Sequence, residues 1–407
     1  MNSLPKELAS SKNPFSTSSI LDFLVICFIA SCIFDPADRI LGLKIPLFVC
    51  FLLIASSALI FRKSNPKVHL IPIFVSLFFL FIPLLGLLNG IAYSGENGEL
   101  GFQMMKGYIL IILLPLLCAL RMDIIPKLVY QLLLLSILII ATYLVVNLFP
   151  ETYIAISELG NISGLVLPDR RSYGNSEEFL QVYYVTSPMI VIAVAYFFSL
   201  AMEKKNIRYY LAFAISVIAM LMAGTRNNIF VAFILPLALI FFRSKYKILF
   251  FPLFVSFIFL SILIFWEEVI QFLSPDEFSN SVKITLVKDY FQILSEPYAL
   301  IFGQGLGVNT FWSAKGYELH LSELTYFEMI RNFGLLGFVT MIYILLLPLI
   351  VLFTNDNSGD FYKNLVIAYI FYLIMCFTNP NLFSSMGILI FISVFSNYFI
   401  CYEHIKG

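Results

Sequence analysis

Apolar runs of about 20 residues recur along this chain from Ser19 to Tyr402, and they constrain its fold more than any other feature. A helix of that length crosses a hydrocarbon core of ~30 Å and satisfies its own backbone N–H and C=O groups there. Of the 407 residues, 60% are hydrophobic and 12% charged, whereas soluble domains carry roughly a quarter charged residues. The sequence therefore predicts an all-α fold, a polytopic membrane helical bundle in which residues 1–407 form one membrane domain.

We expect about twelve transmembrane helices. The predicted spans are residues 19–34, 44–61, 69–90, 104–120, 128–149, 180–202, 209–225, 229–242, 248–266, 328–353, 364–378 and 386–402. The polar segment Met1–Phe15 and the lack of a small-residue cleavage site after the first run predict that no leader is removed.

Cations in the short connections set the predicted orientation, because Lys and Arg accumulate in cytoplasmic loops. One set of connections and tails holds most of the 25 cations: Lys6, Lys12, Arg62, Lys63, Lys67, Arg121, Lys127, Lys204, Lys205, Arg208, Arg243, Lys245, Lys247, Lys363 and Lys406. We therefore expect this set and both termini to lie in the cytoplasm. The opposite set holds most of the acids and two long loops, residues 150–179 and 267–327, which are then periplasmic.

The long loops are expected to carry the chemistry, because the short cytoplasmic connections leave no room for a nucleotide-binding domain. The second loop has about 60 residues, too many for a simple connector. An apolar stripe at helical spacing predicts a helix over residues 279–295 that lies along the membrane surface or caps the bundle. All six cysteines fall in or beside apolar runs, so we interpret them as small hydrophobic residues rather than disulfides or metal ligands.

The first candidate site is a predicted turn between two helices on the periplasmic side, Gly224–Asn228, which contains Thr225, Arg226 and Asn227. A helix N-terminus offers unpaired N–H groups, and a guanidinium beside it adds a bidentate fork, so together they suit a phosphate. The alternative is an arginine that snorkels to the membrane interface.

The second candidate is the segment 168–175 in the first long loop, which contains Arg170, Arg171 and Gly174. It offers further cationic contacts. A solvated loop with a glycine turn is the alternative interpretation.

The third candidate is the segment 303–337. Its Gly303-x-Gly305-x-Gly307 element follows no strand and lies on the periplasmic side, so we predict a close-packed turn and not a nucleotide loop. Downstream, five residues at helical spacing are predicted to share one face of a helix that enters the membrane: Glu323, Phe327, Ile330, Gly334 and Gly337. Glu323 would then lie at the mouth of the bundle, above small residues that allow another helix to approach. The alternative for Glu323 is a solvated acid at a helix start.

This set of motifs, in this order, resembles the O-antigen polymerase and ligase superfamily of membrane glycosyltransferases. The resemblance rests on Arg171-x-x-Gly174 in a periplasmic loop, on Gly224-Thr225-Arg226 at a helix junction, and on the glycine element before Glu323-x(10)-Gly334-x-x-Gly337. In the ligase branch a His precedes the final Gly-x-x-Gly at the position of Glu323. His320 is three residues out of that register, so the resemblance favours the polymerase branch.

The resemblance implies a GT-C-like bundle that transfers a glycan from undecaprenyl diphosphate to an acceptor sugar hydroxyl. It implies Glu323 as the catalytic base, with His320 as its substitute, and Arg226, Arg171 and Arg170 as diphosphate ligands. No metal or other cofactor is expected, since guanidinium groups take the place of the divalent ion. Asp35-Pro36-Ala37-Asp38 is the only metal-like pair predicted to be periplasmic, and its spacing is not Asp-x-Asp.

The expected partners are the lipid-linked oligosaccharide donor and acceptor, membrane lipid and a chain-length regulator protein; no nucleic acid is expected. The leading hypothesis is an O-antigen polymerase of the cell inner membrane. Two alternatives stay open: a ligase that moves finished polymer onto the lipid A core, and a flippase or exporter of lipid-linked glycans. A transporter should bury charges near the bilayer midplane, and Asp22 is the main charge that the sequence places inside a span.

Overall fold

The computed structural model describes residues 17–61, 69–94, 98–171, 179–244, 252, 255–256, 274–275, 278–354 and 359–406. These residues are mostly helical. The apolar helices are α1 (Thr17–Phe34), α2 (Lys44–Ile60), α3 (Leu70–Ser94), α4 (Glu99–Tyr108), α5 (Leu113–Leu120), α6 (Ile125–Leu148), α8 (Ile190–Lys204), α9 (Ile207–Met222), α10 (Arg226–Arg243), α15 (Thr325–Leu345), α16 (Leu347–Thr354), α17 (Asp360–Met375) and α18 (Ser385–Lys406). Three short 3-10 turns, η1 (Ile109–Ile112), η2 (Ser187–Met189) and η3 (Cys376–Thr378), continue or precede them.

Seven helical segments of the described chain are long and apolar enough to cross a membrane. They are Leu70–Tyr93, Glu99–Leu120, Ile125–Leu148, Ser187–Lys204, Arg226–Arg243, Thr325–Leu345 and Asp360–Thr378. Four shorter apolar helices accompany them: Ser19–Phe34, Lys44–Ile60, Ile207–Met222 and Ser385–Ile400. Each segment corresponds to a predicted span. The remaining predicted span, residues 248–266, lies outside the described residues except for Pro252, Val255 and Ser256.

Apolar side chains cover the outer face of the bundle as well as its centre. On α3, Phe74, Leu77 and Phe81 are each more than half exposed, whereas α8 is buried continuously from Ile190 to Ala201. A water-soluble protein seldom exposes such a continuous apolar surface. An all-α bundle with this surface is a membrane-embedded fold.

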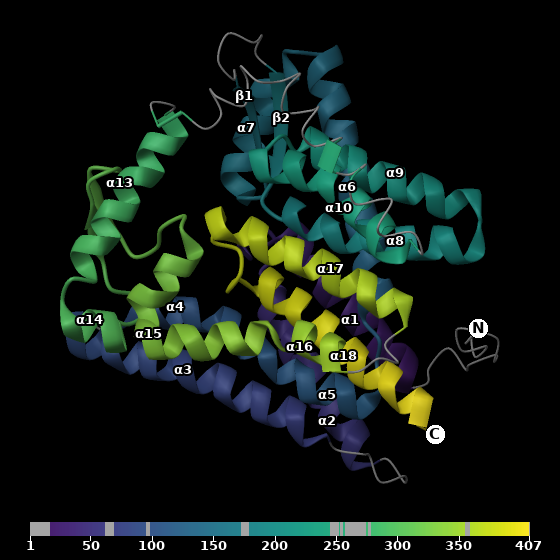
Figure 1. Cartoon of the computed structure of the whole chain (residues 1–407), viewed down its shortest axis with the longest axis horizontal. Coiled ribbons are helices and arrows are strands. Elements are labelled where there is room, and N and C mark those ends of the chain that lie inside the picture. The colour runs from purple at the N-terminus through teal and green to yellow at the C-terminus, as the bar shows by residue number, and fades with distance from the viewer. Residues whose placement is uncertain are drawn as a thin grey trace.

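The helices run roughly side by side, and the ends of the bundle differ (Figure 1). The turn between α8 and α9, which carries Lys204 and Lys205, lies at the right of the view, where α18 also ends. At the left, α13 (Phe278–Ile293) crosses the end of the bundle and α14 (Pro297–Phe302) lies beside it. The predicted helix over residues 279–295 is therefore confirmed, and it caps one end.

Two small hairpins accompany the loop helices and were not predicted. In the first long loop, α7 (Thr152–Ser163) precedes β1 (Val166–Arg171), which pairs antiparallel with β2 (Phe179–Tyr184), with Asp169 opposite Gln181. The predicted boundary between the loop 150–179 and the span 180–202 is therefore wrong, because residues 180–184 form a strand and the helical segment begins at Ser187. In the second long loop, β3 (Thr310–Trp312) pairs antiparallel with β4 (Tyr317–Leu319). The second loop has a small core of its own, formed by Leu286, Tyr290, Trp312 and Leu324. The described part of this loop from residue 278 onward is therefore a folded unit.

Candidate functional site

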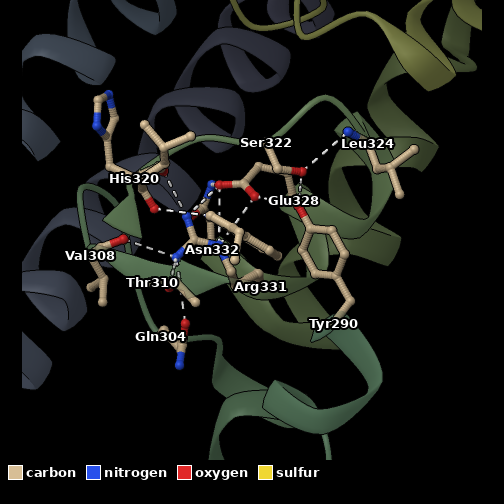
Figure 2. Close-up of polar contacts among 12 residues, drawn as sticks. Tyr290, Gln304, Val308, Thr310, His320, Ser322, Leu324, Glu328, Arg331 and Asn332 are labelled. Carbon is tan, nitrogen blue, oxygen red and sulfur yellow. Dashed lines mark hydrogen bonds and ion pairs between the residues drawn. The ribbon is translucent and has the colours of Figure 1, made fainter. Parts of the chain in front are cut away.

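A buried ion pair lies in the first two turns of α15. Glu328 is 5% exposed and Arg331 is completely buried, and their side chains form an i,i+3 salt bridge through Arg331 Nη2. Arg331 Nε also donates to both carboxylate oxygens at 3.2 Å. Tyr290 Oη donates to Glu328 Oε2 at 2.6 Å, and Asn332 Nδ2 donates to Oε1 at 3.2 Å (Figure 2). Three side chains thus enclose one carboxylate with donors.

The remaining donors of Arg331 fasten the second long loop to α15. Nη1 donates to the Val308 carbonyl and to Thr310 Oγ1, both at 3.1 Å, and Nη2 donates to the His320 carbonyl at 2.8 Å. The guanidinium also lies 6.0 Å from the centre of the Trp312 ring. A planar fork with five N–H donors can hold several acceptors in fixed directions. Arg331 therefore ties the segment before β3 and the end of β4 to one point of the helix (Figure 2).

Tyr290 joins α13 to the same cluster. Its hydroxyl lies 2.5 Å from Ser322 Oγ as well as within bonding distance of Glu328. Burial, with the negative charge of Glu328 close by, raises the pKa of Tyr290 well above its ordinary value. The phenol therefore stays protonated and acts as a donor to the carboxylate.

The glycine element at residues 303–307 packs directly on α3 and α4. Gly303, Gly305 and Gly307 all have positive φ, a conformation that glycine adopts readily because it has no Cβ. A Cβ on Gly305 would collide with the backbone of Gly90 on α3, and one on Gly307 with Gly101 on α4. The Leu306 N–H donates to the Gly86 carbonyl at 2.8 Å. The predicted close-packed turn is thus confirmed.

A cavity of about 640 Å³ opens between α2, α4, α15 and the segment before α18. Its apolar lining includes Phe48, Met104, Tyr108, Met329, Phe333 and Phe383. Its polar lining includes Lys44, Lys106, Ser322, Glu328, Asn332 and Ser384. Such a mixed cavity suits an amphipathic ligand.

Glu323 does not occupy the position that the helical pattern predicted. Because α15 begins only at Thr325, Glu323 precedes the helix, and its side chain is 45% exposed in a salt bridge of 2.9 Å with Lys315. The backbone of α15 also breaks at Gly334, where φ is 66°. The predicted single helical face from Glu323 to Gly337 is therefore wrong. Glu323 does not line the cavity, although Leu321 and Ser322 beside it do.

The two glycines of α15 do allow close approach. A Cβ on Gly334 would collide with the Ile301 carbonyl of α14, and one on Gly337 would press on Ile82 of α3. His320 contributes its backbone carbonyl to Arg331, and its imidazole points away from the buried ion pair (Figure 2). His320 lies just after β4 and outside α15.

The Gly224–Asn228 segment forms the predicted helix junction. Thr225 is the N-cap of α10, and its Oγ1 accepts from the Asn228 N–H at 3.2 Å. Arg226, in the first turn, donates to Asn280 Oδ1 of α13 at 3.0 Å. Asn227 Nδ2 donates to Thr378 Oγ1 at 2.6 Å. The junction therefore touches both the second long loop and η3.

The other predicted arginines belong to the first hairpin. Arg170 is exposed, and its guanidinium lies 6.0 Å from the centre of the Tyr153 ring on α7. Arg171 ends β1, where its backbone pairs with Phe179. Gly174 lies outside the described residues. The hairpin reaches the Gly224 turn, because a Cβ on Gly224 would collide with Gln181 of β2.

The acidic pair Asp35 and Asp38 organises the loop between α1 and α2. The Asp35 carboxylate accepts from the N–H groups of Arg39, Ile40 and Leu41 at 2.8 to 3.1 Å, and Asp38 Oδ1 accepts from the Lys44 N–H at 3.2 Å. Within the described residues, no three His, Cys, Asp or Glu side chains gather into a metal-binding group.

The sequence prediction missed the charges that are most deeply buried. Asp22, which was expected to be the main charge inside a span, is about half exposed and pairs with Lys127 at 3.0 Å. Glu328 and Arg331 were overlooked because the span 328–353 was taken to begin at Glu328. An acid and a base three residues apart in an apolar helix are a recognisable signal of a buried pair.

Comparisons with family models, with curated proteins and with solved structures found no match for this chain.

Proposed function

We propose that this protein is an O-antigen polymerase: a membrane glycosyltransferase that joins oligosaccharide repeat units carried on undecaprenyl diphosphate. The supporting observation is the 640 Å³ cavity at the loop end of the bundle, where apolar walls from α2, α4 and α15 meet the cations Lys44 and Lys106. A lipid-linked glycan has the same two parts, an apolar tail and an anionic, hydroxyl-rich head. We place this end at the periplasmic face of the cell inner membrane.

A second cavity supports a long lipid substrate. It has a volume of about 330 Å³ between α15 and α17 and is lined by Tyr326, Ile342, Leu345, Leu346, Ile370, Leu373, Ile374 and Phe377. Tyr326 is the neighbour of Thr325, which lines the larger cavity. The linings of the two cavities thus include neighbouring residues of α15, and from Tyr326 the second cavity extends along the helix to Leu346.

The proposed reaction breaks the bond between the anomeric carbon of the donor and its diphosphate oxygen, and the diphosphate leaves with the electron pair. The acceptor hydroxyl forms the new bond and gives its proton to a carboxylate base. Glu323, which lies outside the cavity lining but beside the lining residue Ser322, is the better candidate of the two acids near the start of α15. Its side chain is half exposed with one lysine partner, whereas Glu328 is already bonded to Arg331, Tyr290 and Asn332. Arg226, with Arg171 and Arg170, is proposed to stabilise the leaving diphosphate.

Two alternative functions predict different products. A ligase would transfer finished polymer to a lipid A core, and a flippase would move the lipid-linked glycan across the membrane unchanged. Deletion of the gene followed by gel analysis of surface polysaccharide distinguishes a polymerase from a ligase. A single repeat unit on the lipid core indicates a lost polymerase, whereas polymer left on the lipid carrier indicates a lost ligase.

The base assignment is tested with purified Glu323→Gln and a synthetic undecaprenyl-diphosphate repeat unit. Loss of a general base lowers the rate by about 10² to 10⁴-fold, so chain extension on a gel should nearly stop. Glu318→Gln is the matched control, because Glu318 is an exposed acid of β4 in the same long loop. Extension by Glu323→Gln at more than about a tenth of the wild-type rate would exclude Glu323 as the base.

The diphosphate assignment is tested with Arg226→Lys, which keeps the charge and loses the bidentate fork. We expect most polymerisation to be lost, and Arg171→Lys to have a milder effect. Arg243→Lys, at the opposite end of α10, is the control and should polymerise normally. Wild-type chain lengths from Arg226→Lys at normal expression would remove this assignment.

The proposed orientation places both termini in the cytoplasm and both long loops outside it. A single cysteine at Ser281 on α13 should react with a membrane-impermeant thiol reagent in whole cells, and one at Ser64 should not. The reverse pattern would show that the orientation is wrong.

A further inference from the structure

Helix α7 of the first long loop exposes an apolar face. Ile154, Leu159 and Ile162 are 67%, 63% and 71% exposed. An α-helix turns about 100° per residue, so these three side chains fall within about 140° of one another. They form one stripe along the helix, and such a stripe indicates contact with an apolar environment.

The opposite face of α7 is fixed to the first hairpin, beside which the helix lies in Figure 1. A Cβ on Gly160 would collide with the Val166 carbonyl of β1, and Tyr153 Oη donates to the Pro168 carbonyl at 3.2 Å. Ile156 packs against the hydrophobic core. Whatever holds the exposed face of α7 therefore also holds the hairpin.

The exposed face of α7 adjoins the lipid-facing end of α6. Leu144, Leu148 and Phe149 at that end are each about half exposed or more. Helix α7 begins at Thr152, and Glu151 is the only charged residue between Phe149 and that start. The apolar surface thus continues from a transmembrane helix into the loop helix.

Lipid fits this face better than a protein partner does. The 12 residues of α7 make a helix about 18 Å long and about 10 Å wide, so one face covers roughly 200 Å². A stable protein interface buries about 800 Å² on each partner. Interfacial helices need no such area, because their apolar side chains enter the boundary between headgroups and acyl chains to a depth of about 5 to 10 Å. Glu158 is the only charged residue within α7, so the helix offers anionic headgroups no cation.

We propose that α7 is a membrane-interface helix whose exposed face inserts among lipid acyl chains beside the end of α6. This inference goes beyond the proposed reaction and does not depend on it. Through the contacts with β1, the inserted helix holds the first hairpin at the membrane surface. Isolated helices shorter than about 12 to 15 residues are marginal in water, so the lipid also stabilises α7 itself.

Photo-crosslinking tests which molecule covers the face. The full chain carries photoreactive benzoylphenylalanine in place of Leu159 or Ile162 and is reconstituted into nanodiscs of radiolabelled phosphatidylcholine. Phe81 on α3 and Tyr317 on β4, both more than half exposed, are replaced in the same way as the membrane and the loop reference. After illumination, the two α7 positions should take up lipid label to within about twofold of Phe81 and at least about fivefold above Tyr317.

Two results of this experiment would overturn the proposal. One is lipid labelling of both α7 positions at the level of Tyr317. The other is a crosslinked product of twice the mass of the chain, which would show that a second copy covers the face. Labelling should also be equal in phosphatidylcholine and phosphatidylglycerol nanodiscs, and a requirement for phosphatidylglycerol would mean a headgroup site and contradict acyl-chain insertion.

Hydrogen exchange tests whether the lipid holds the helix. In the same nanodiscs, the α7 amides of Leu159→Glu/Ile162→Glu should exchange at least about tenfold faster than those of wild type, because the charged face leaves the membrane and the helix opens locally. Glu158→Gln/Asn161→Ser is the matched control, because it changes two exposed polar residues of the same helix and leaves the apolar stripe intact. Its amides should exchange as in wild type. Equal exchange in the glutamate variant and wild type would show that α7 does not depend on the membrane and would overturn the proposal.

Discussion

Two carboxylates five residues apart, Glu323 and Glu328, occupy opposite kinds of environment. Glu323 lies on the loop before α15, is 45% exposed by side chain and has Lys315 as its partner. Glu328 lies inside the first turns of α15 and is enclosed by Arg331, Tyr290 and Asn332. A base must be able to receive a proton, and a carboxylate surrounded by donors has no free place for one. This difference is why we propose Glu323 as the base, whereas Glu328 holds Arg331, which fastens the loop to α15.

Glu328→Gln should have the largest effect on stability. It leaves the Arg331 guanidinium charged and unpaired in a buried site, which typically costs about 3 to 5 kcal/mol. Unfolding can be followed on heating with a thiol-reactive dye, because Cys32, Cys118 and Cys376 are buried free thiols. If the free energy of unfolding fell by less than about 1 kcal/mol, the buried pair would not hold the loop. The proposed difference between a structural Glu328 and an exposed Glu323 would then be wrong.

Tyr290→Phe should have the second largest effect on stability. It removes one donor from the Glu328 carboxylate and the contact with Ser322, and bonds to charged groups contribute about 1.5 to 3 kcal/mol. We expect a loss of about 2 kcal/mol in the same thermal assay. Tyr298→Phe is the control, because Tyr298 is exposed on α14 and its hydroxyl donates to Asn89 Oδ1 of α3. Equal losses in the two variants would argue against a special role for Tyr290.

Asp35 is a third kind of carboxylate, buried and held mainly by backbone N–H groups, with the charge of Lys44 as a smaller influence on its pKa. Burial raises its pKa, but the N–H groups of Leu41, Arg39 and Ile40 outweigh that effect and hold the pKa below its ordinary value. Asp35→Asn keeps one acceptor oxygen and should cost about 1.5 kcal/mol at pH 7. A lowered folded-state pKa means that this stabilisation is present above the unfolded pKa of about 3.8 and disappears as pH falls through the folded value. The difference between Asp35→Asn and wild type should therefore vanish in strong acid, and a pH-independent difference would contradict this account.

Glu323→Gln should have the smallest effect on stability. Exposed ion pairs contribute about 0 to 1 kcal/mol, so the variant should unfold within about 1 kcal/mol of wild type while losing turnover. A double-mutant cycle with Lys315→Met should give a coupling energy below about 1 kcal/mol that decreases with added salt. A coupling above about 2 kcal/mol would make Glu323 a structural residue like Glu328.

The helices were predictable and the loop architecture was not. Apolar length alone located the apolar helices of the bundle, and the stripe around Leu286 and Tyr290 located α13, because both signals are local in the sequence; α7 and α14 were not located. The hairpins β1–β2 and β3–β4 depend on pairing and packing with distant segments. Arg171, for example, pairs with Phe179 across the turn, and no periodicity near Arg171 indicates this.

The candidate site was predictable as a set of segments but not as a set of contacts. The Gly224–Asn228 junction and the glycine turn at Gly305 were recognisable from their residues. Helical spacing placed Glu323 on α15, and the late start of the helix at Thr325 overrode it. Arg331 reaches carbonyls of Val308 and His320, and such backbone partners leave no trace in the identities of those residues.

The docking of the glycine turn has a consequence for how the protein matures. Leu306 bonds Gly86, and Gly305 packs on Gly90, so the late loop closes on helices that enter the membrane much earlier in synthesis. Contacts between such distant segments form slowly. The contact surface on α3 and α4 is therefore made before the second long loop, and the hydrogen bonds of Arg331 hold the loop only after α15 has been made. A nascent chain truncated before α15 should expose this loop to protease, although α3 and α4 are already inserted.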